Sequence, residues 1–219
     1  LSARENKPNA EQLAAIIQSS QQQFSIITGG PGTGKTTTVT LLLWLFYQIY
    51  GAELKVKICA PTGKAAVRVR ESIEHSVASL ASASDLGISL ECFALLLAEQ
   101  TNFGTLHKLL GYLPQNIYFR HNAQNLLEVE VLIVDESSMV GLPLFSKLLA
   151  ALDPTKLRHI VLLGDKNQLS SVEEGYVFAS LVNLRKISRD HQAYDLFAYH
   201  EKSLAAELVT SNRNQGEIY

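Results

Sequence analysis

The chain has 219 residues, of which 47% are hydrophobic and 18% are charged, a composition typical of a folded, water-soluble protein with a substantial core. Its formal net charge of −2 at pH 7 gives no overall attraction to nucleic acid, although it does not exclude a local basic groove. The longest apolar run, near Leu41–Tyr47, ends at Gln48 and is far too short to span a membrane, so we predict no membrane association.

Helical patterns and short apolar runs alternate along the chain. Residues 1–8 are polar and are predicted to be loose. The predicted elements that follow are, in chain order, a helix over Asn9–Gln18, a strand over Phe24–Thr28, a helix over Thr37–Tyr50, a strand over Val56–Ala60, helices over Ala65–Leu80, Leu90–Ala98 and Leu106–Gly111, a strand over Val129–Asp135, a helix over Gly141–Leu152 and a strand over His159–Gly164. This alternation predicts an α/β fold, a three-layer sandwich with a mainly parallel central sheet.

The segments between these elements indicate the domain organisation. Ala81–Ser89 is rich in alanine and serine and predicts a connector, and Leu113–Leu127 has little periodicity and predicts a long loop. We predict one domain over residues 9–185, with a helical and loop insertion over 71–127. Residues 186–219 are predicted to form a tail, of which Lys186–Leu204 has no clear periodicity and is expected to lie loosely.

The ends of the chain and its cysteines indicate its cellular setting. The first residues lack the pattern of a secretory signal, and neither Cys59 nor Cys92 stands in a metal-ligand spacing. Both are expected to be reduced thiols in the core, so we predict a cytoplasmic protein. Because the sequence starts at Leu1 rather than Met and stops at Tyr219, we expect it to be a piece of a larger protein.

The loop after the first predicted strand reads Gly29-Gly30-Pro31-Gly32-Thr33-Gly34-Lys35-Thr36 and matches the phosphate-binding pattern G-x-x-x-x-G-K-[ST]. Its glycines allow backbone N–H groups to surround phosphate oxygens, and the following helix adds partial positive charge. Lys35 can reach the β- and γ-phosphates, and Thr36 can ligate Mg²⁺. We predict that this loop, with Thr37, binds a nucleoside triphosphate such as ATP. An ordinary glycine-rich turn is the alternative.

Two acidic residues, Asp135 and Glu136, end the strand predicted over Val129–Asp135. Asp135 is predicted to hold Mg²⁺ together with Thr36, and Glu136 to orient and deprotonate the water that attacks the γ-phosphate. Gln168 follows the last predicted strand and is our candidate for sensing the γ-phosphate. The acid pair of Asp135 and Glu136 favours a hydrolase over a small-molecule kinase. The alternative is that they are two surface acids at a strand end.

Several segments together resemble superfamily 1 DNA helicases of the RecD type, the alpha subunits of exodeoxyribonuclease V. They are, in chain order, Asn9-Ala10-Glu11-Gln12, the loop Gly29–Thr36, Ala60-Pro61-Thr62-Gly63-Lys64-Ala65-Ala66, Thr105-Leu106-His107-Lys108-Leu109-Leu110-Gly111, Val134-Asp135-Glu136-Ser137-Ser138-Met139, Gly164–Leu169 with Ser171–Gly175, and Leu208-Val209-Thr210-Ser211-Asn212-Arg213. The resemblance covers about Asn9 to Arg213 and implies a RecA-like P-loop NTPase fold, with residues 9–185 as the first of two motor domains. The family's later motifs and second motor domain are absent from the sequence.

The resemblance also implies roles for individual residues. Gln12 would contact adenine. Arg213, at the end of the segment Leu208–Arg213, would reach the γ-phosphate as an arginine finger. Single-stranded DNA would be contacted by Pro61, Thr62, Lys64, Thr105 and His107. The alternatives left open are a solvated loop arginine at 213, a solvated helix lysine at 64, and a helix-start histidine at 107 bonded to a nearby carbonyl.

The function implied is a DNA-dependent ATP hydrolase that couples hydrolysis to translocation on single-stranded DNA and to duplex unwinding, with RecB- and RecC-like subunits as partners. This would serve DNA recombination and repair. On its own the piece is expected to be weakly active or inactive. A different class, an ATP-binding regulatory switch that never translocates, is the alternative, and an RNA helicase also remains open.

Overall fold

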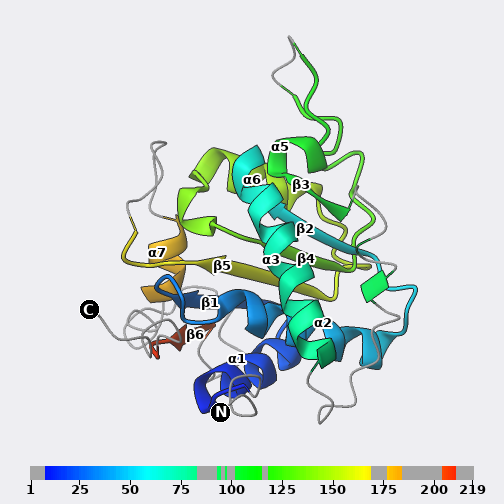
Figure 1. The fold of residues 1–219 in the computed structure, drawn as a ribbon. Helices are drawn as coiled ribbons and strands as arrows, with labels where there is room; N and C mark the ends of the chain where they lie inside the picture. The colour runs from blue at the N-terminus through cyan, green and yellow to red at the C-terminus, as the bar shows by residue number, and fades with distance from the viewer. Residues whose placement is uncertain are drawn as a thin grey trace.

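A parallel β-sheet forms the centre of this computed structural model, which describes residues 8–82, 93–94, 97, 102–114, 118–168, 177–183 and 204–210. Within these residues the sheet has six strands in the order β3-β2-β4-β5-β1-β6, and every pairing is parallel. The strands are β1 (Phe24–Gly29), β2 (Val56–Ala60), β3 (Phe103–Thr105), β4 (Val131–Val134), β5 (His159–Gly164) and β6 (Ala205–Leu208). Their carboxyl ends therefore lie along one edge, as in other open α/β sheets (Figure 1).

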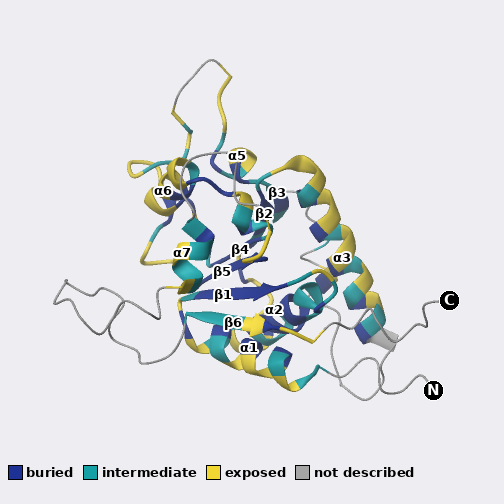
Figure 2. Ribbon diagram, turned by 90° about the vertical axis from the view of Figure 1, so that its left-hand side faces the viewer, coloured by how far each residue is buried: buried dark blue, intermediate teal, exposed yellow. Residues whose placement is uncertain are grey.

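Helices cover both faces of this sheet, which makes the three layers that the alternating pattern predicts. The helices are α1 (Ala10–Gln21), α2 (Lys35–Tyr50), α3 (Gly63–Ser82), the short α5 (Leu106–Leu109), α6 (Leu142–Ala151), α7 (Val177–Asn183) and the 3-10 turn η3 (Ser137–Met139). In Figure 2, α2 and α3 lie on one side of the sheet and α6 and α7 on the other. None of the described helices combines the length and the apolar character needed to cross a bilayer.

Alternating residues of each strand enter two separate hydrophobic cores. In β1, Ile27 packs into the core under α1, α2 and α3, while its neighbour Ile26 packs into the core under α5, α6 and α7. In β5, Val161 and Leu162 divide between the same two cores. Because both faces are buried, these strands read as continuous apolar runs rather than as alternating ones, and this is why the sequence predicts them.

Local signals set the helix ends. Asn9 caps α1 in a capping box with Gln12, and Thr105 caps α5 by accepting a hydrogen bond from the N–H of Lys108. At the other end of α2, Gly51 has a φ of +89°, which ends the helix. The predicted helices agree with α1, α2, α3, α5 and α6 to within a few residues; α2 begins at Lys35 rather than at Thr37, so the phosphate-loop lysine already belongs to the helix.

Two strands are absent from the sequence-based prediction. β3 has three residues at one edge of the sheet, and β6 is an edge strand whose Ala205, Ala206 and Glu207 are not fully buried. Neither has the apolar run that identifies a buried strand. β6 pairs with β1, so the sheet includes residues beyond the predicted domain boundary at 185.

Other predictions have mixed or untested outcomes. The strand predicted over Val129–Asp135 is shorter in the structure, at Val131–Val134. Cys59 is a buried free thiol in β2, and burial raises its pKa to about 12. Of the predicted helix over Leu90–Ala98, Phe93, Ala94 and Leu97 are helical. Ala83–Ser89, Cys92 and the segment from Lys186 to Ser203 lie outside the described residues.

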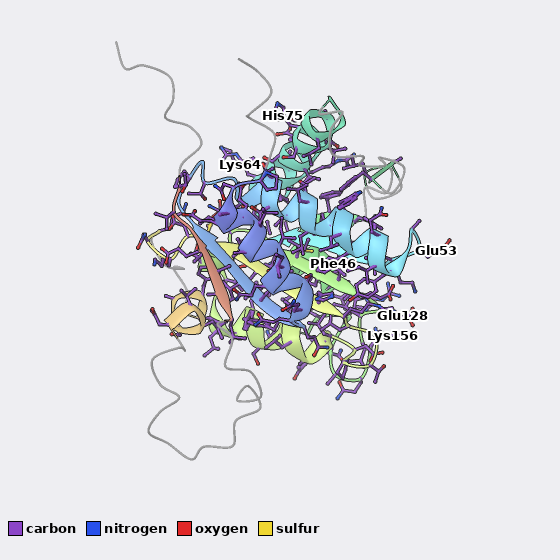
Figure 3. The ribbon with its side chains drawn as sticks, turned by 90° about the horizontal axis from the view of Figure 1, so that it is seen from below. Phe46, Glu53, Lys64, His75, Glu128 and Lys156 are labelled. Carbon is purple, nitrogen blue, oxygen red and sulfur yellow. The ribbon has the colours of Figure 1, made fainter. Side chains whose placement is uncertain are left out.

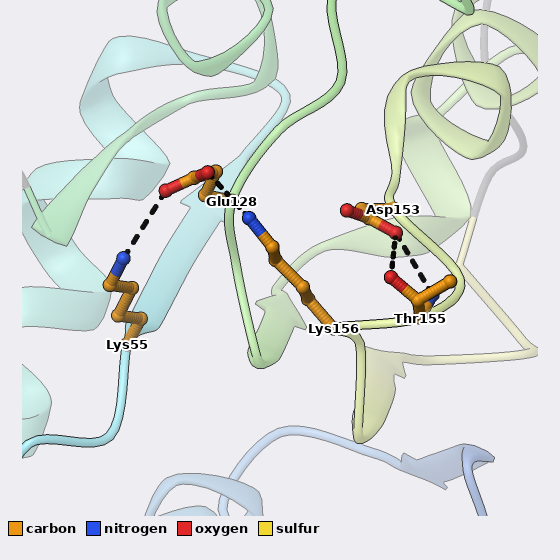
Figure 4. Close-up of polar contacts among 5 residues, drawn as sticks. All are labelled: Lys55, Glu128, Asp153, Thr155 and Lys156. Atoms are coloured by element: carbon orange, nitrogen blue, oxygen red, sulfur yellow. Dashed lines mark hydrogen bonds and ion pairs between the residues drawn. The ribbon is translucent and has the colours of Figure 1, made fainter.

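At the amino ends of the strands the surface is charged and polar. Glu128, just before β4, forms ion pairs with Lys55 and Lys156, which precede β2 and β5 (Figure 4). Nearby, Thr155 donates to the carboxylate of Asp153 through both its N–H and its hydroxyl. The ion-paired groups Lys55, Glu128 and Lys156 are largely exposed, so solvent and salt screen their attraction. This end of the sheet is therefore a solvated surface.

We expect Phe46→Ala to lower the free energy of unfolding by about 3–5 kcal/mol, the usual cost of removing a buried aromatic ring. Phe46 on α2 is 0% exposed, lies in the middle of the molecule in Figure 3, and stacks on the ring of His159 with centroids 4.2 Å apart. Urea denaturation measures the loss. Ile49→Ala, which truncates a 53% exposed side chain on the same helix, is the control and should cost under roughly 0.5 kcal/mol. Equal losses would contradict this packing.

Candidate functional site

The loop between β1 and α2 adopts a shape that needs glycine. Gly32 and Gly34 have φ angles of +80° and +83°, a region that side chains disfavour. A Cβ atom on Gly29 would lie 2.7 Å from the carbonyl oxygen of Leu208 and 2.7 Å from Oγ1 of Thr33, so β6 and the loop leave no room for one. The Thr33 hydroxyl in turn donates to the carbonyl of Gly30, at 2.9 Å, and closes the loop on itself.

The start of α2 provides the donors that an anion requires. Its N-cap is Gly34, which offers no side-chain acceptor, so the backbone N–H groups of the first turn have no side-chain cap. Lys35 Nζ donates to the carbonyl oxygens of Gly29 at 2.6 Å and Gly30 at 3.0 Å, which fixes its ammonium group over the loop. Thr36 follows in the same turn and is half-buried. These groups fit a polyphosphate.

Asp135 and Glu136 lie at the carboxyl end of β4, where a hydrogen bond, burial and nearby charges define the setting of Asp135. Asp135 Oδ1 accepts from the N–H of Glu136 at 2.9 Å. Burial raises the pKa of Asp135 above its usual value, the charge of Glu136 raises it further, and the charge of Lys35 lowers it. β1 and β4 are parallel and end at the same edge of the sheet with β5 between them, so the phosphate loop and the acid pair lie along one edge, and the charge of Lys35 reaches Asp135.

Glu136 carries a strained backbone. Its φ of +50° makes it the one positive-φ residue other than glycine in the described part of the chain. Such conformations cost roughly 1–3 kcal/mol and cluster at functional sites, where the surrounding structure holds them. The next residue, Ser137, is buried and donates its hydroxyl to the carbonyl of Val134 at 2.7 Å, which closes the turn from β4 into η3. The turn thereby fixes the direction in which Glu136 leaves the strand.

The turn after β5 is attached to the strand that leads into the phosphate loop. The N–H of Lys166 donates to Oγ1 of the buried Thr28 on β1, at 3.3 Å. Asp165, 7% exposed, accepts from the N–H of Asn167 through its carboxylate and from the N–H of Gln168 through its carbonyl. The predicted sensor Gln168 is exposed at this edge, beside β1. Sequence reasoning missed Thr28 and Asp165, since a threonine in an apolar strand gives no signal by itself.

Gln12 lies against the phosphate loop from the side of α1. It is 3% exposed, and its Nε2 donates to the carbonyl oxygen of Thr33 at 3.4 Å. Its Oε1 accepts from the N–H of Asn9 at 2.9 Å, which completes the capping box. The residue predicted to contact adenine is therefore a link between the helix start and the loop. The preceding residue, Glu11, contacts Val209 and Thr210, which follow β6.

The candidate DNA contacts gather at the other end of the same edge. Ala60 of β2 pairs in register with Thr105 of β3, so Pro61 and Thr62 leave the sheet beside the start of α5. Thr62 Oγ1 accepts from the N–H of Ala65, just as Thr105 Oγ1 accepts from Lys108. Both hydroxyls thus cap a following helix.

Lys64 and His107 are exposed next to these caps. The His107 ring makes edge contacts with Tyr112 and Phe119, with centroid distances of 6.3 and 5.7 Å. Tyr112 is 57% exposed, which adds an aromatic surface to this end of the sheet. Arg213 lies outside the described residues, which end at Thr210 after β6.

The described residues contain no group of three or more histidine, cysteine or acidic side chains that could hold a metal ion by themselves. A hydroxyl at Thr36 and a carboxylate at Asp135 are hard oxygen ligands, the kind that Mg²⁺ takes together with water and substrate phosphates. The donor set therefore fits Mg²⁺ brought in with a nucleotide.

The parallel sheet, the glycine loop at the end of β1 and the acid pair at the end of β4 define a RecA-like domain of the P-loop nucleoside triphosphatase class. The chain belongs to the AAA domain family, which matches residues 12–174.

Similar proteins of known name show which members of this class the chain resembles. The chain is 42% identical over 185 residues to the RecBCD enzyme subunit RecD of Haemophilus influenzae, covering 84% of this chain and 28% of the relative. It is 34% identical over 184 residues to the ATP-dependent RecD2 DNA helicase of Deinococcus radiodurans, covering 84% and 21%. The predicted resemblance to RecD-type helicases is thereby confirmed, and the chain spans under a third of either relative's length.

A solved structure supports the fold. The Pif1 helicase from Candida albicans superimposes with a TM-score of 0.51 at 21% identity, covering 96% of this chain and 41% of that one. At this identity the likeness concerns the fold alone, and it agrees with the predicted three-layer arrangement.

Proposed function

We propose that this chain is the first motor domain of a DNA-dependent ATPase that couples ATP hydrolysis to movement along single-stranded DNA and to duplex unwinding. The observation that carries the proposal is that one edge of the sheet holds two groups of residues. The phosphate loop and acid pair end β1 and β4, and the candidate DNA contacts end β2 and β3.

The nucleotide half of the site has a role for each residue. The loop from Gly29 to Thr37 would hold the phosphates, Lys35 would neutralise them, and Gln12 would contact the base. Thr36 and Asp135 would hold Mg²⁺, which when bound draws negative charge from the phosphate oxygens. Glu136 would take a proton from the attacking water, and its strained, fixed backbone supports such a role.

The remaining assignments concern the γ-phosphate and the partners. Gln168 would sense the γ-phosphate from the end of β5, and Arg213 would reach it as an arginine finger. Because one relative is named a RecBCD subunit, we propose RecB- and RecC-like subunits as partners, and a cytoplasmic location. A regulatory ATP switch would need neither a general base nor the exposed side chains of Lys64 and His107 beside the helix caps at Thr62 and Thr105, so we favour the motor.

We expect single-stranded DNA to raise the steady-state rate of ATP hydrolysis by the full-length protein several-fold or more. Lys64→Ala should raise the DNA concentration for half-maximal stimulation several-fold, because one cationic contact to the backbone is lost. Lys156→Ala, at the amino ends of the strands, is the matched control and should leave that concentration unchanged (Figure 3). A rate of ATP hydrolysis that single-stranded DNA does not change would contradict the motor and favour the regulatory switch.

A further inference from the structure

The chain leaving β6 is held by a single carboxylate from the other end of the sequence. Glu11, in the first turn of α1, accepts hydrogen bonds at Oε2 from the N–H groups of Val209 at 2.9 Å and Thr210 at 3.0 Å. Its Oε1 accepts from the Thr210 hydroxyl at 3.1 Å. Three donors from two consecutive residues therefore converge on one side chain, which fixes both the position and the direction of the chain at this point.

This contact depends on charge as well as on shape. The N–H groups of Thr210 and Val209 lower the pKa of Glu11, so the side chain stays ionised across the neutral range. Val209 is 70% exposed and packs little of its own side chain. The carboxylate, rather than burial, thus supplies the restraint.

The same turn of α1 also touches the nucleotide loop. Gln12 donates to the Thr33 carbonyl, and the Leu208 carbonyl closely approaches Gly29. From the β5 side, Lys166 forms an ion pair with Glu207 of β6 at 2.6 Å, and its N–H donates to Thr28 on β1. The carboxyl end of β6 is therefore held from two sides, by the first turn of α1 and by the turn after β5. The first of these contacts the phosphate loop, and the second contacts β1.

We propose that Glu11 is a positioning residue that fixes Val209 and Thr210 against the first turn of α1, which also contacts the phosphate loop through Gln12. It thereby fixes the point from which the chain continues toward Arg213, the arginine finger proposed above. The inference rests on the proposed function for its effect on hydrolysis. Without the carboxylate, the chain is free to pivot after Leu208, the last residue held by the β1–β6 ladder. Nucleotide affinity, which depends on the loop, would change little, whereas the proposed arginine finger Arg213 would no longer start from a fixed point at Thr210.

Amide hydrogen exchange tests the contact directly in the full-length protein. In Glu11→Ala, the amides of Val209 and Thr210 should exchange at least about 10-fold faster than in the wild type, because their acceptor is gone. Glu11→Gln, which keeps one carbonyl oxygen, should give an intermediate rate. Glu53→Ala removes an exposed carboxylate at the far side of the molecule and should leave both amides unchanged (Figure 3). Unchanged exchange in Glu11→Ala would overturn the proposal, whether or not the protein hydrolyses ATP.

Kinetics separate positioning from general stability. Glu11→Ala should lower kcat for ATP about 5- to 10-fold with KM within about 2-fold, the pattern of an interaction used mainly in the transition state. Glu11→Gln should recover part of kcat. An equal loss in KM, or a kcat equal to that of the wild type despite fast exchange, would overturn the positioning role. Absence of hydrolysis in the wild type would instead count against the proposed function, and the exchange result would stand.

Discussion

Glu136→Gln is expected to lower the turnover number for ATP by at least about 100-fold, since general-base catalysis commonly contributes 10²- to 10⁴-fold. Glutamine keeps the size of the side chain and a carbonyl oxygen, but it cannot accept the proton of the attacking water. The Asp135 carboxylate still accepts from the backbone N–H of residue 136, so the turn after β4 should keep its shape. Turnover is measured at saturating ATP, and binding with a fluorescent ATP analogue, whose dissociation constant should remain within about 3-fold.

The backbone at residue 136 makes this substitution informative. Glutamine meets the same cost at a φ of +50° as glutamate does, so the change does not relieve the strain. Glu128→Gln is the matched control, because Glu128 precedes the same strand β4 at its opposite end and pairs with exposed lysines (Figure 4). Turnover by Glu136→Gln at the wild-type rate would remove Glu136 from the role of base.

Lys35→Ala is expected to weaken ATP binding by about 100-fold or more, because a charge-assisted contact to the phosphates is lost. The nucleotide-free structure predicts a second effect. Lys35 Nζ donates to the carbonyls of Gly29 and Gly30, and alanine leaves these two acceptors without that donor. The melting temperature of the nucleotide-free protein should therefore also fall, by a few degrees.

Calorimetric titration with ATP and thermal unfolding without nucleotide measure the two effects separately. Lys55→Ala, which removes an exposed lysine before β2, is the control for the loss of a positive charge. A fall in affinity with an unchanged melting temperature would show that Lys35 leaves the loop carbonyls in solution and serves the phosphates alone.

Much of the candidate nucleotide site could be proposed from local sequence, because its residues are concentrated in short segments. The spacing from Gly29 to Thr36 and the adjacent acids at 135 and 136 each follow a recognisable apolar run. The two segments together predict a shared Mg²⁺ site, but neither segment shows that β5 lies between β1 and β4. Strand order depends on how whole faces of helices and strands pack against one another. No short segment of the sequence shows this packing.

The contacts that were missed join residues far apart in the chain. Glu11 and Thr210 meet across almost the whole sequence, and Thr28 binds the backbone of Lys166. A glutamate in the first turn of a helix is common, because the positive end of the helix dipole stabilises its charge. Its second use becomes visible only when β6 is placed next to α1. The edge strands β3 and β6 were missed for the related reason that half-exposed strands need no apolar run.

The pairing of β6 with β1 bears on how the domain can be divided. β1, the strand that carries the phosphate loop, has β5 on one side and β6 on the other, with Ile26 to Gly29 aligned to Ala205 to Leu208. A chain cut at residue 185 would turn β1 into an edge strand. Its unpaired N–H and C=O groups, set among apolar side chains, would offer a template to a second molecule. Four residues from far along the sequence therefore protect the strand that carries the phosphate loop from intermolecular pairing.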